Sequence, residues 1–235
     1  MMNYQKIIEK IELELKRHLG SKKAIIGISG GIDSAVVAAL CVRAFGKENV
    51  IGILIPYGTQ SIEDGKVLVN HLGLESREIN IKEIVDKFDY LKFDNISLGN
   101  IMARTRMIIL YSFANQLNGI VVGTSNKTEI EIGYFTKYGD GGCDIEPIGD
   151  LYKTEVFEIA KILGIPKKIM GRKPSAELYD GQTDEGEIGA SYNGIDSVLK
   201  GKITKGKIYD IIQERIKSSE HKRRMPPTFN VREGK

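Results

Sequence analysis

Short apolar runs alternate with longer helical segments along the first 125 residues, and this alternation restricts the fold more than any other feature of the chain. Residues 23–29 and 49–56 are short apolar runs of the buried-strand type, and a third and a fourth strand are predicted at residues 76–81 and 119–125. Three helical segments separate them: residues 33–45, 61–73 and 100–119. This rhythm predicts an α/β fold in which helices flank a doubly wound parallel sheet, with ligands beyond the carboxyl ends of the strands.

Further helices are expected at both ends of the chain. Apolar residues recur at helical spacing from Ile7 to Leu19, and Gly20 ends that predicted helix. Downstream helices are predicted at residues 153–164, about 188–200 and 204–218. In the helix at 61–73, Ser61 followed by Asp64 predicts a variant of the capping box.

Two long segments are rich in glycine and polar residues. We interpret residues 126–152 and 171–189 as substrate loops, because unstructured segments of that length inside a compact protein are usually functional. Residues 1–235 are then expected to form a single domain, in which C-terminal helices and a basic tail occupy residues 188–235.

The composition is that of an ordinary globular protein. The 34 Lys and Arg residues nearly balance the 31 Asp and Glu residues, so no nucleic-acid partner is expected. No apolar stretch of about 18 residues is present, and the charged N-terminus lacks the apolar core of a signal peptide. We therefore expect a cytoplasmic protein without a membrane partner. Cys41, Cys143 and the three histidines are too scattered for a disulfide framework or a metal site.

The stretch Gly27–Ala35, "GISGGIDSA", fits two kinds of site. It matches G-x-S-x-G, the turn that presents a nucleophilic serine in α/β-hydrolases. It also has the form of a glycine-rich loop that leads into a helix and binds phosphate. The hydrolase interpretation needs a histidine downstream of Ser29. His71 lies on a polar helix and His221 in a basic run, so the phosphate interpretation is favoured.

The loop differs from a Walker A sequence, because Asp33 stands near the position where that motif has lysine. A carboxylate beside phosphates repels them unless a cation lies between, so Asp33 is a candidate Mg²⁺ ligand. The alternative is that Asp33 only caps its helix. Glu129 follows the fourth predicted strand and is expected in the same crevice, where the two carboxylates could share one metal ion. The alternative for Glu129 is that it is only a solvated glutamate at the start of a helix.

A series of motifs extends this interpretation to most of the chain. "SGGIDS" resembles the pyrophosphatase loop of N-type ATP pyrophosphatases. "PYGTQ", "GNIMARTRM", "GTSNKTE", "GYFTKYGDGGCD", "LYKTEV", "RKPSAEL" and "EHKRRMPP" follow in the order typical of NAD⁺ synthetases, from about residue 24 to 228. The loop by itself also occurs in GMP synthetases, asparagine synthetases and tRNA-thiolating enzymes. "FTKYGDGG" and "EHKR" are narrower signals, and they favour the NAD⁺ synthetase family.

The resemblance implies an adenine nucleotide α-hydrolase-like (Rossmann-like) sheet and a role for individual residues. Mg²⁺ would bind to Asp33 and Glu129, and these two residues would act in catalysis with Lys153. ATP would contact Gly27, Ile28, Ser29, Gly30, Gly31, Ile32, Asp33, Ser34, Gln60, Thr124, Lys153 and Ser175. Deamido-NAD⁺ would contact Arg104, Phe135, Lys137, Asp144, His221 and Lys222, at the interface of a homodimer. Ile32 and Ser175 depart from the common glutamine and threonine, but neither change removes a needed group.

The resemblance implies a ligase that amidates deamido-NAD⁺ through an acyl-adenylate. Lys153 opens a predicted helix, where a cation opposes the helix dipole, and a bound polyphosphate would offset that cost. The chain shows no glutaminase domain or N-terminal nucleophilic cysteine, so free ammonia is expected as the nitrogen donor, with or without a separate glutaminase subunit. Two alternatives stay open: another ATP pyrophosphatase, of the tRNA-thiolating or GMP synthetase type, and a non-catalytic adenine-nucleotide-binding module.

Overall fold

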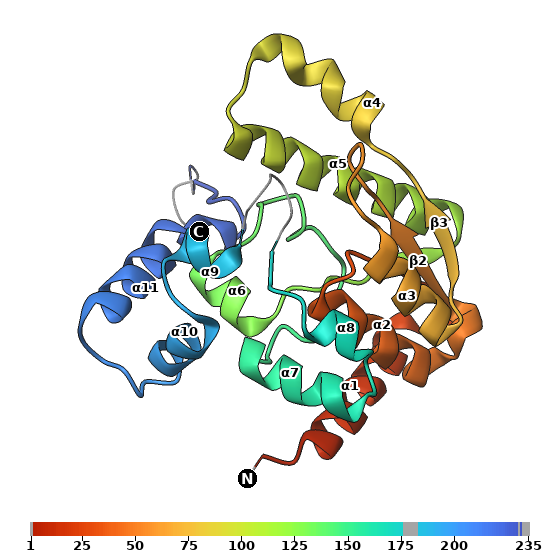
Figure 1. Cartoon of the computed structure of the whole chain (residues 1–235), viewed down its shortest axis with the longest axis horizontal. Coiled ribbons are helices and arrows are strands. Elements are labelled where there is room, and N and C mark those ends of the chain that lie inside the picture. Colours follow the sequence, from red (N-terminus) through yellow and green to blue (C-terminus); the bar gives the residue numbers. More distant parts are fainter. Residues whose placement is uncertain (1, 176–182, 230, 232–235) are drawn as a thin grey trace.

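A computed structural model describes residues 2–175, 183–229 and 231. Among these residues, four parallel strands form one sheet in the order β3–β2–β1–β4 (Figure 1). The strands are β1 (Lys23–Gly27), β2 (Val50–Leu54), β3 (Glu75–Glu78) and β4 (Gly119–Val121). Ile25 of β1 lies in register with Ile51 of β2 and with Val121 of β4. The predicted parallel sheet is therefore confirmed.

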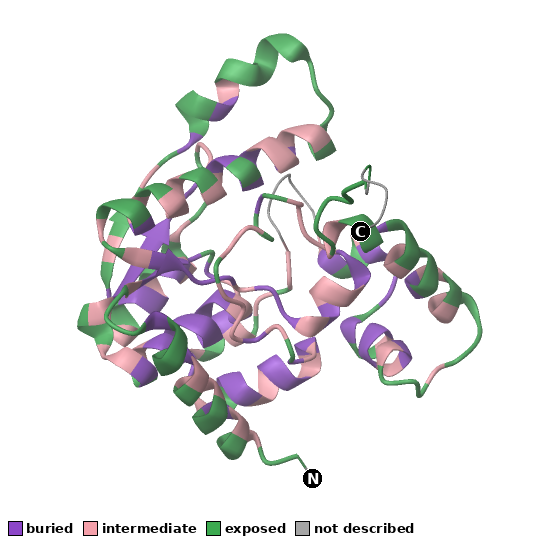
Figure 2. Ribbon diagram, turned by 180° about the vertical axis from the view of Figure 1, so that it is seen from behind, coloured by how far each residue is buried: buried purple, intermediate pink, exposed green. Residues whose placement is uncertain are grey.

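Alternate side chains of the central strand enter different cores. Ala24 and Ile26 pack against α1 (Tyr4–Leu19), α2 (Ile32–Phe45) and α7 (Lys153–Ile162). Ile25 points to the other face and packs against α5 (Asn95–Gln116). All three side chains are buried, and the buried strands are the purple arrows toward the left of Figure 2. Because both faces are covered at the centre of the sheet, β1 and β2 consist of apolar runs rather than of alternating apolar and polar residues, whereas the edge strand β3 is polar and largely exposed.

The order of the strands fixes the position of the site. The connections after β1 and β2 contain α2 and α3 (Glu63–Leu72), and the connection from β3 to β4 contains α4 (Lys82–Val85) and α5. After β1, the chain continues through β2 and β3 on one side of β1 and returns on the other side as β4. The β1–β4 border is therefore a topological switch point. The segments after these two strands carry Asp33 and Glu129.

Helices of the C-terminal half form a third apolar core beside the sheet. This core joins α6 (Lys127–Ile132) to α9 (Asp184–Ile188), α10 (Tyr192–Leu199) and α11 (Lys207–Ser218). The short α8 (Lys167–Met170), which the sequence did not predict, packs against α2 (Figure 1). Within residues 2–175 and 183–229, no helix has the length and apolar character needed to cross a lipid bilayer.

Three local predictions were wrong. The helix after β2 has Ile62 as its N-cap, without a side-chain cap, so Ser61 and Asp64 form no capping box. The segments predicted as loops contain α6 at the start of 126–152 and α9 within 171–189, and residues 176–182 of the second segment lie outside the described residues. The long helix α5 begins at Asn95 instead of residue 100, since the Asp94 carboxylate accepts a hydrogen bond from Ser97 N and caps the earlier turn.

Candidate active site

The glycine-rich loop after β1 is closed by its own hydrogen bonds. Ser29 Oγ accepts a hydrogen bond from Gly31 N at 3.2 Å and lies 3.1 Å from Ser34 Oγ. Gly30 has a φ of 81°, and a Cβ at this position would approach Gly65 N to 3.0 Å. Only glycine adopts this conformation without strain in so little space. The backbone is therefore open to a ligand at the start of α2, as a phosphate loop requires.

The structure contradicts the hydrolase interpretation of the same loop. A cavity of about 480 Å³ adjoins Ser29, and no histidine is among the described residues that line it. Among the described residues, the Ser29 hydroxyl hydrogen-bonds with Gly31 and Ser34, and neither of these groups is a general base. A serine nucleophile needs a base within hydrogen-bond distance. Ser29 is therefore suited to bind a ligand rather than to attack one.

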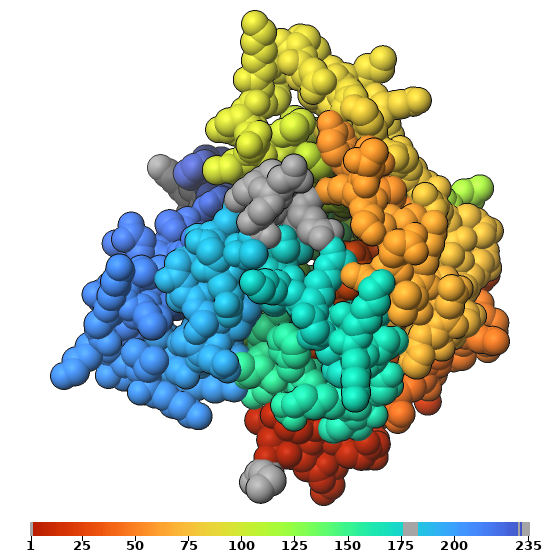
Figure 3. Space-filling view, viewed as in Figure 1, coloured from red at the N-terminus to blue at the C-terminus, as the bar shows by residue number. Residues whose placement is uncertain are grey.

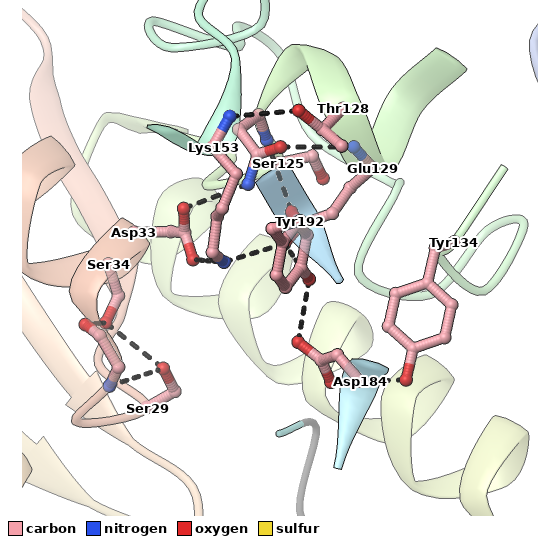
Figure 4. A network of polar contacts seen from close by, with 12 residues as sticks. Ser29, Asp33, Ser34, Ser125, Thr128, Glu129, Tyr134, Lys153, Asp184 and Tyr192 are labelled. Atoms are coloured by element: carbon pink, nitrogen blue, oxygen red, sulfur yellow. Dashed lines mark hydrogen bonds and ion pairs between the residues drawn. The ribbon is translucent and has the colours of Figure 1, made fainter. Parts of the chain in front are cut away.

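Three charged side chains from distant parts of the sequence meet beside this loop (Figure 4). Lys153 Nζ lies 2.6 Å from Asp33 Oδ2 and 2.9 Å from Glu129 Oε1. The side chain of Lys153 is only 2% exposed. The sequence prediction that Asp33 and Glu129 occupy one crevice is confirmed, and Lys153 lies between them.

The first turns of two helices hold the carboxylates in place. Asp33 lies in the first turn of α2, whose N-cap is Gly31, so Asp33 does not cap the helix. Glu129 forms a capping box with Asn126, the N-cap of α6. The Asn126 side chain also donates a hydrogen bond to Asp33 Oδ1 at 3.0 Å. Asn126 thus links the two carboxylates. The spacing of the motif "NKTE" could have indicated this cap.

Lys153 is the first residue of α7, where its positive charge opposes the helix dipole. The sequence analysis assigned the compensation to a bound polyphosphate. In the structure, Asp33 and Glu129 also face this charge, and the contribution of a polyphosphate stays a prediction. The two ion pairs fix the position of the Lys153 ammonium, as preorganised electrostatic stabilisation requires.

The electrostatics of the cluster favour an additional cation. Burial raises the pKa of Glu129 to about 7, while the adjacent Lys153 lowers it. Burial lowers the pKa of Lys153, but Asp33 and Glu129 outweigh this effect and hold the pKa above its ordinary value. Two carboxylates face one ammonium in this cluster, so a bound cation would favour the ionised form of Glu129.

The donor set of the cluster fits a hard divalent ion. Across the described ranges, no three His, Cys, Asp or Glu side chains gather into a group that could hold a metal ion. Asp33 and Glu129 would thus supply only two carboxylate ligands. Mg²⁺ commonly binds in this way, through one or two carboxylates while substrate phosphates and water fill the other positions.

A chain of hydrogen bonds connects the cluster to α9 and α10. The Tyr192 hydroxyl lies 3.2 Å from Glu129 Oε1 and 2.9 Å from Asp184 Oδ2, so both carboxylates compete for its one proton. Tyr134 OH lies 3.2 Å from Asp184 Oδ1 (Figure 4). The ring of Tyr192 also lies 4.8 Å from Lys153 Nζ, which adds a cation–π contact. These tyrosines and Asp184 are support residues that the sequence analysis missed, because the contacts exist only in the folded chain.

Replacing Tyr192 with phenylalanine keeps the ring above Lys153 but removes the hydroxyl that joins Glu129 to Asp184. We expect the free energy of unfolding to fall by about 1.5–3 kcal/mol, the usual range for hydrogen bonds to charged groups. Urea denaturation would measure it. Tyr209→Phe on α11 is a matched control, since no described partner hydrogen-bonds to its hydroxyl. Equal effects of the two variants would contradict this role for Tyr192.

Most of the predicted ATP residues line this one cavity. Its lining includes Gly27, Ile28, Ser29, Gly31, Ile32, Asp33, Gln60, Thr124, Glu129, Lys153 and Ser175. Gly30 and Ser34 are not among the lining residues, although they shape the loop. Gln60 Oε1 accepts a hydrogen bond from Arg106 at 2.9 Å, and Arg106 also binds Ile55 O. Arg106 lines the cavity as well, and the sequence analysis did not select it.

The predicted dinucleotide residues divide into two groups. Phe135 and Lys222 line the cavity, and Lys222 Nζ donates hydrogen bonds to the carbonyl oxygens of Gly133 and Phe135. Figure 3 shows the blue C-terminal part of the chain at the left, the teal segment that contains α7 and α8 next to it, and the orange segment that leads to α3 at the right of the same face. The cavity lining likewise draws on both the N-terminal and C-terminal halves of the chain.

The other predicted dinucleotide residues lie outside the cavity. Lys137 Nζ donates to His221 O at 2.6 Å, and Arg104 lies 3.4 Å from Lys137 O. Asp144 instead ties its loop to the sheet, because it accepts hydrogen bonds from Val121 N and Tyr111 OH. Arg104, Lys137 and His221 thus form a separate surface group, whereas Asp144 has a clear structural contact.

Comparison with known proteins decides the family. The family model described as NAD synthase matches residues 3–226. The chain belongs to the NAD synthase family. It is 49% identical to the NH₃-dependent NAD⁺ synthetase of Pyrococcus horikoshii over 97% of this chain and 96% of that protein. The same name is given to a protein of Thermoplasma acidophilum that is 49% identical over 96% of this chain and 98% of its own length.

Among solved structures of the NAD synthase family's fold, an NMN synthetase from Francisella tularensis is 36% identical, with a TM-score of 0.93 over 98% of this chain and 100% of its own. The NH₃-dependent NAD synthetase of Campylobacter jejuni is 34% identical, with a TM-score of 0.84 over 97% and 100% of the two chains. The Rossmann-like α/β fold predicted from the sequence is thereby confirmed.

Proposed function

We propose that this chain is a C–N ligase that joins ammonia to the nicotinate carboxylate of deamido-NAD⁺. The reaction consumes ATP and yields NAD⁺, AMP and pyrophosphate. The observation that carries the proposal is the Asp33–Lys153–Glu129 cluster beside a phosphate loop, within a chain of the NAD synthase family. A family model that spans residues 3–226 also favours this reaction over tRNA thiolation or GMP synthesis.

The proposed chemistry has two steps. A carboxylate oxygen of the nicotinate group attacks the α-phosphorus of ATP, the bond to the β,γ-pyrophosphate breaks, and an acyl-adenylate forms. Ammonia then attacks the acyl carbon, loses a proton, and releases AMP from the amide. The N–H groups of the loop and the ammonium of Lys153 stabilise negative charge that develops on the phosphates. No covalent enzyme intermediate is required.

Asp33 and Glu129 would hold Mg²⁺, and phosphate oxygens of ATP would complete its coordination. The ion would supply positive charge at the phosphates when bound. Asn126, which hydrogen-bonds to both carboxylate residues, would keep them oriented toward it. A non-catalytic nucleotide-binding module would have no need for this pair of carboxylates.

The surface group of Arg104, Lys137 and His221 supports a dinucleotide site that extends beyond the cavity. In a homodimer, the partner would cover the rest of deamido-NAD⁺ at the interface. We propose such a dimer, located in the cytoplasm. A second candidate substrate is nicotinate mononucleotide, because a structure with a TM-score of 0.93 to this chain is described as an NMN synthetase. Both substrates present the same carboxylate to ATP.

Product analysis tests these assignments. The protein is incubated with ATP, Mg²⁺ and ammonium, together with either deamido-NAD⁺ or nicotinate mononucleotide, and the nucleotides are separated by chromatography. NAD⁺ and AMP in equal amounts, formed faster from the dinucleotide, are expected. Faster turnover of the mononucleotide would replace the substrate but keep the chemistry. AMP without an amide product would contradict the proposed acceptor.

Replacing Ser29 with alanine should reduce kcat/KM for ATP by about tenfold, the loss expected for one hydrogen bond to a phosphate. Considerable activity should survive, because the loop N–H groups and Lys153 are unchanged. Steady-state kinetics with varied ATP would measure the effect. Complete loss of turnover, together with a covalent intermediate detected by mass spectrometry on the parent protein but not on the variant, would restore the nucleophile interpretation.

A further inference from the structure

Asp196 of α10 is a buried acidic residue whose two side-chain oxygens contact two other helices. The residue is only 2% exposed. Its Oδ1 accepts a hydrogen bond from the Thr128 hydroxyl at 2.5 Å, and its Oδ2 accepts one from Thr154 N at 3.0 Å. Thr128 is the second residue of α6, and Thr154 is the second residue of α7. One side chain of α10 therefore connects the starts of the two helices that carry Glu129 and Lys153.

The hydrogen bonds continue from Thr128 to the backbone of Lys153. Thr128 Oγ1 accepts a hydrogen bond from Lys153 N at 2.9 Å, while the hydroxyl proton is donated to Asp196 (Figure 4 shows the contact between Thr128 and Lys153). All three residues are buried. Hydrogen bonds in such surroundings are electrostatically stronger than in water. Because Thr128 directly precedes Glu129, these contacts fix the backbone of Lys153 relative to that carboxylate.

These contacts also satisfy the start of α7. The N-cap is Tyr152, which is not one of the residues that usually cap a helix with a short polar side chain. The first N–H groups of a helix have no acceptor inside the helix. Here Lys153 N has Thr128 as its acceptor, and Thr154 N has Asp196. A carboxylate at this end of a helix also favours the helix dipole, which the lysine ammonium opposes.

Tyr192 makes a second contact from α10 to the same lysine. Tyr192 and Asp196 are four residues apart on one helix, so their side chains lie on the same face. The ring of Tyr192 lies 4.8 Å from Lys153 Nζ, and its hydroxyl lies 3.2 Å from Glu129 Oε1. Helix α10 thus contacts the ammonium of Lys153 directly and its backbone through Thr128.

We propose that Asp196 is a positioning residue for Lys153. Through Thr128 and Thr154 N it fixes the start of α7, and this keeps the Lys153 ammonium between the two carboxylates of the cluster. This inference rests on the proposed ligase function. Asp196 is not among the described residues that line the cavity, so its effect on the reaction passes through its neighbours. A catalytic group that moves by about 1 Å can lose about 100-fold in rate.

Kinetics test this role through Asp196→Asn, which keeps the size of the side chain but replaces one acceptor oxygen with an NH₂ group. We expect kcat to fall by about 10- to 100-fold, while KM for ATP and for the nicotinate substrate stays within about twofold. Thr128→Val, which removes the hydroxyl, should lower kcat by a similar factor, and Thr128→Ser should restore most of it. The double variant Asp196→Asn/Thr128→Val should lose little more than the worse single variant, because both changes break one chain of contacts.

A matched control makes the same chemical change elsewhere. Asp210→Asn lies in the first turn of α11, where the residue is exposed, and it should keep the parent kcat. All rates are measured at a temperature where circular dichroism shows that the variants are folded. A folded Asp196→Asn protein with the parent kcat would overturn the proposal. Equal losses in Asp196→Asn and Asp210→Asn, or a fully additive double variant, would overturn it as well.

Amide hydrogen exchange measured by NMR tests the contacts without turnover. In Asp196→Asn, exchange at Lys153 N and Thr154 N should be about 10- to 100-fold faster than in the parent, the factor expected when a hydrogen bond to a charged group is lost. Asp210→Asn should leave both rates unchanged. Parent exchange rates at both amides in Asp196→Asn would overturn the proposal. A parent protein that forms no amide product would refute the ligase function, and faster exchange in Asp196→Asn would then still support the role of Asp196 at the start of α7.

Discussion

Replacing Lys153 with methionine is expected to lower kcat by about 100- to 1000-fold, the usual cost of losing a preorganised group that stabilises transition-state charge. The same change leaves Asp33 and Glu129 close together and without their counter-ion. The free energy of unfolding should therefore fall by about 3–5 kcal/mol, as for other broken buried ion pairs. Activity assays at saturating substrates and urea denaturation would measure the two effects.

A matched control separates catalysis from stability. The control is Lys161→Met on the same helix. The side chain of Lys161 is 59% exposed, and its ion pair among the described residues is with Glu158. This variant should keep the parent kcat and change the stability by less than about 1 kcal/mol. The kinetic comparison is made at a temperature where circular dichroism shows that both variants are folded. Parent-like turnover by folded Lys153→Met would contradict the role given to this residue.

Replacing Glu129 with glutamine is expected to lower the rate by about 100-fold and to raise the Mg²⁺ concentration that gives half of the maximal rate. Glutamine keeps the size of the side chain but removes half of the proposed carboxylate pair. A titration of activity with Mg²⁺ at fixed ATP measures both effects. Glu131→Gln, two residues along the same helix, is the control, because Glu131 has no contact with Lys153 or Asp33 among the described residues.

The metal dependence distinguishes a ligand from a structural residue. If Glu129 only neutralised Lys153, its loss would reduce the rate without moving the Mg²⁺ midpoint. An unchanged Mg²⁺ midpoint in Glu129→Gln would therefore contradict the proposed metal site, whatever the reaction rate of the variant. The capping box with Asn126 keeps an acceptor oxygen in the glutamine variant, so α6 should stay folded.

The sheet and the approach of Asp33 to Glu129 followed from the sequence because each depends on a local pattern. The alternation of short strand-like segments with helical ones indicated the sheet, and parallel strands in a doubly wound sheet bring the segments after them to one edge. The N-cap of α5 at Asp94 was also readable in principle, yet the apolar pattern drew attention to a later start. The apolar pattern and the capping signal indicated different starts for this helix, and the structure follows the capping signal.

The support of the site could not be predicted in the same way. Tyr192 and Asp184 are 63 and 55 residues from Glu129 in the sequence, and no period or motif connects them to it. Their contact with the cluster depends on how the C-terminal helices pack beside α6.

Isotope transfer tests the central claim most directly. Deamido-NAD⁺ labelled with ¹⁸O in both carboxylate oxygens is turned over with ATP, Mg²⁺ and ammonium, and the products are analysed by mass spectrometry. Because the carboxylate oxygen that attacks the α-phosphorus leaves with the phosphate, one ¹⁸O should appear in AMP and one should stay in the amide of NAD⁺. AMP free of ¹⁸O would show that the carboxylate never bonds to the α-phosphorus, and would contradict the acyl-adenylate.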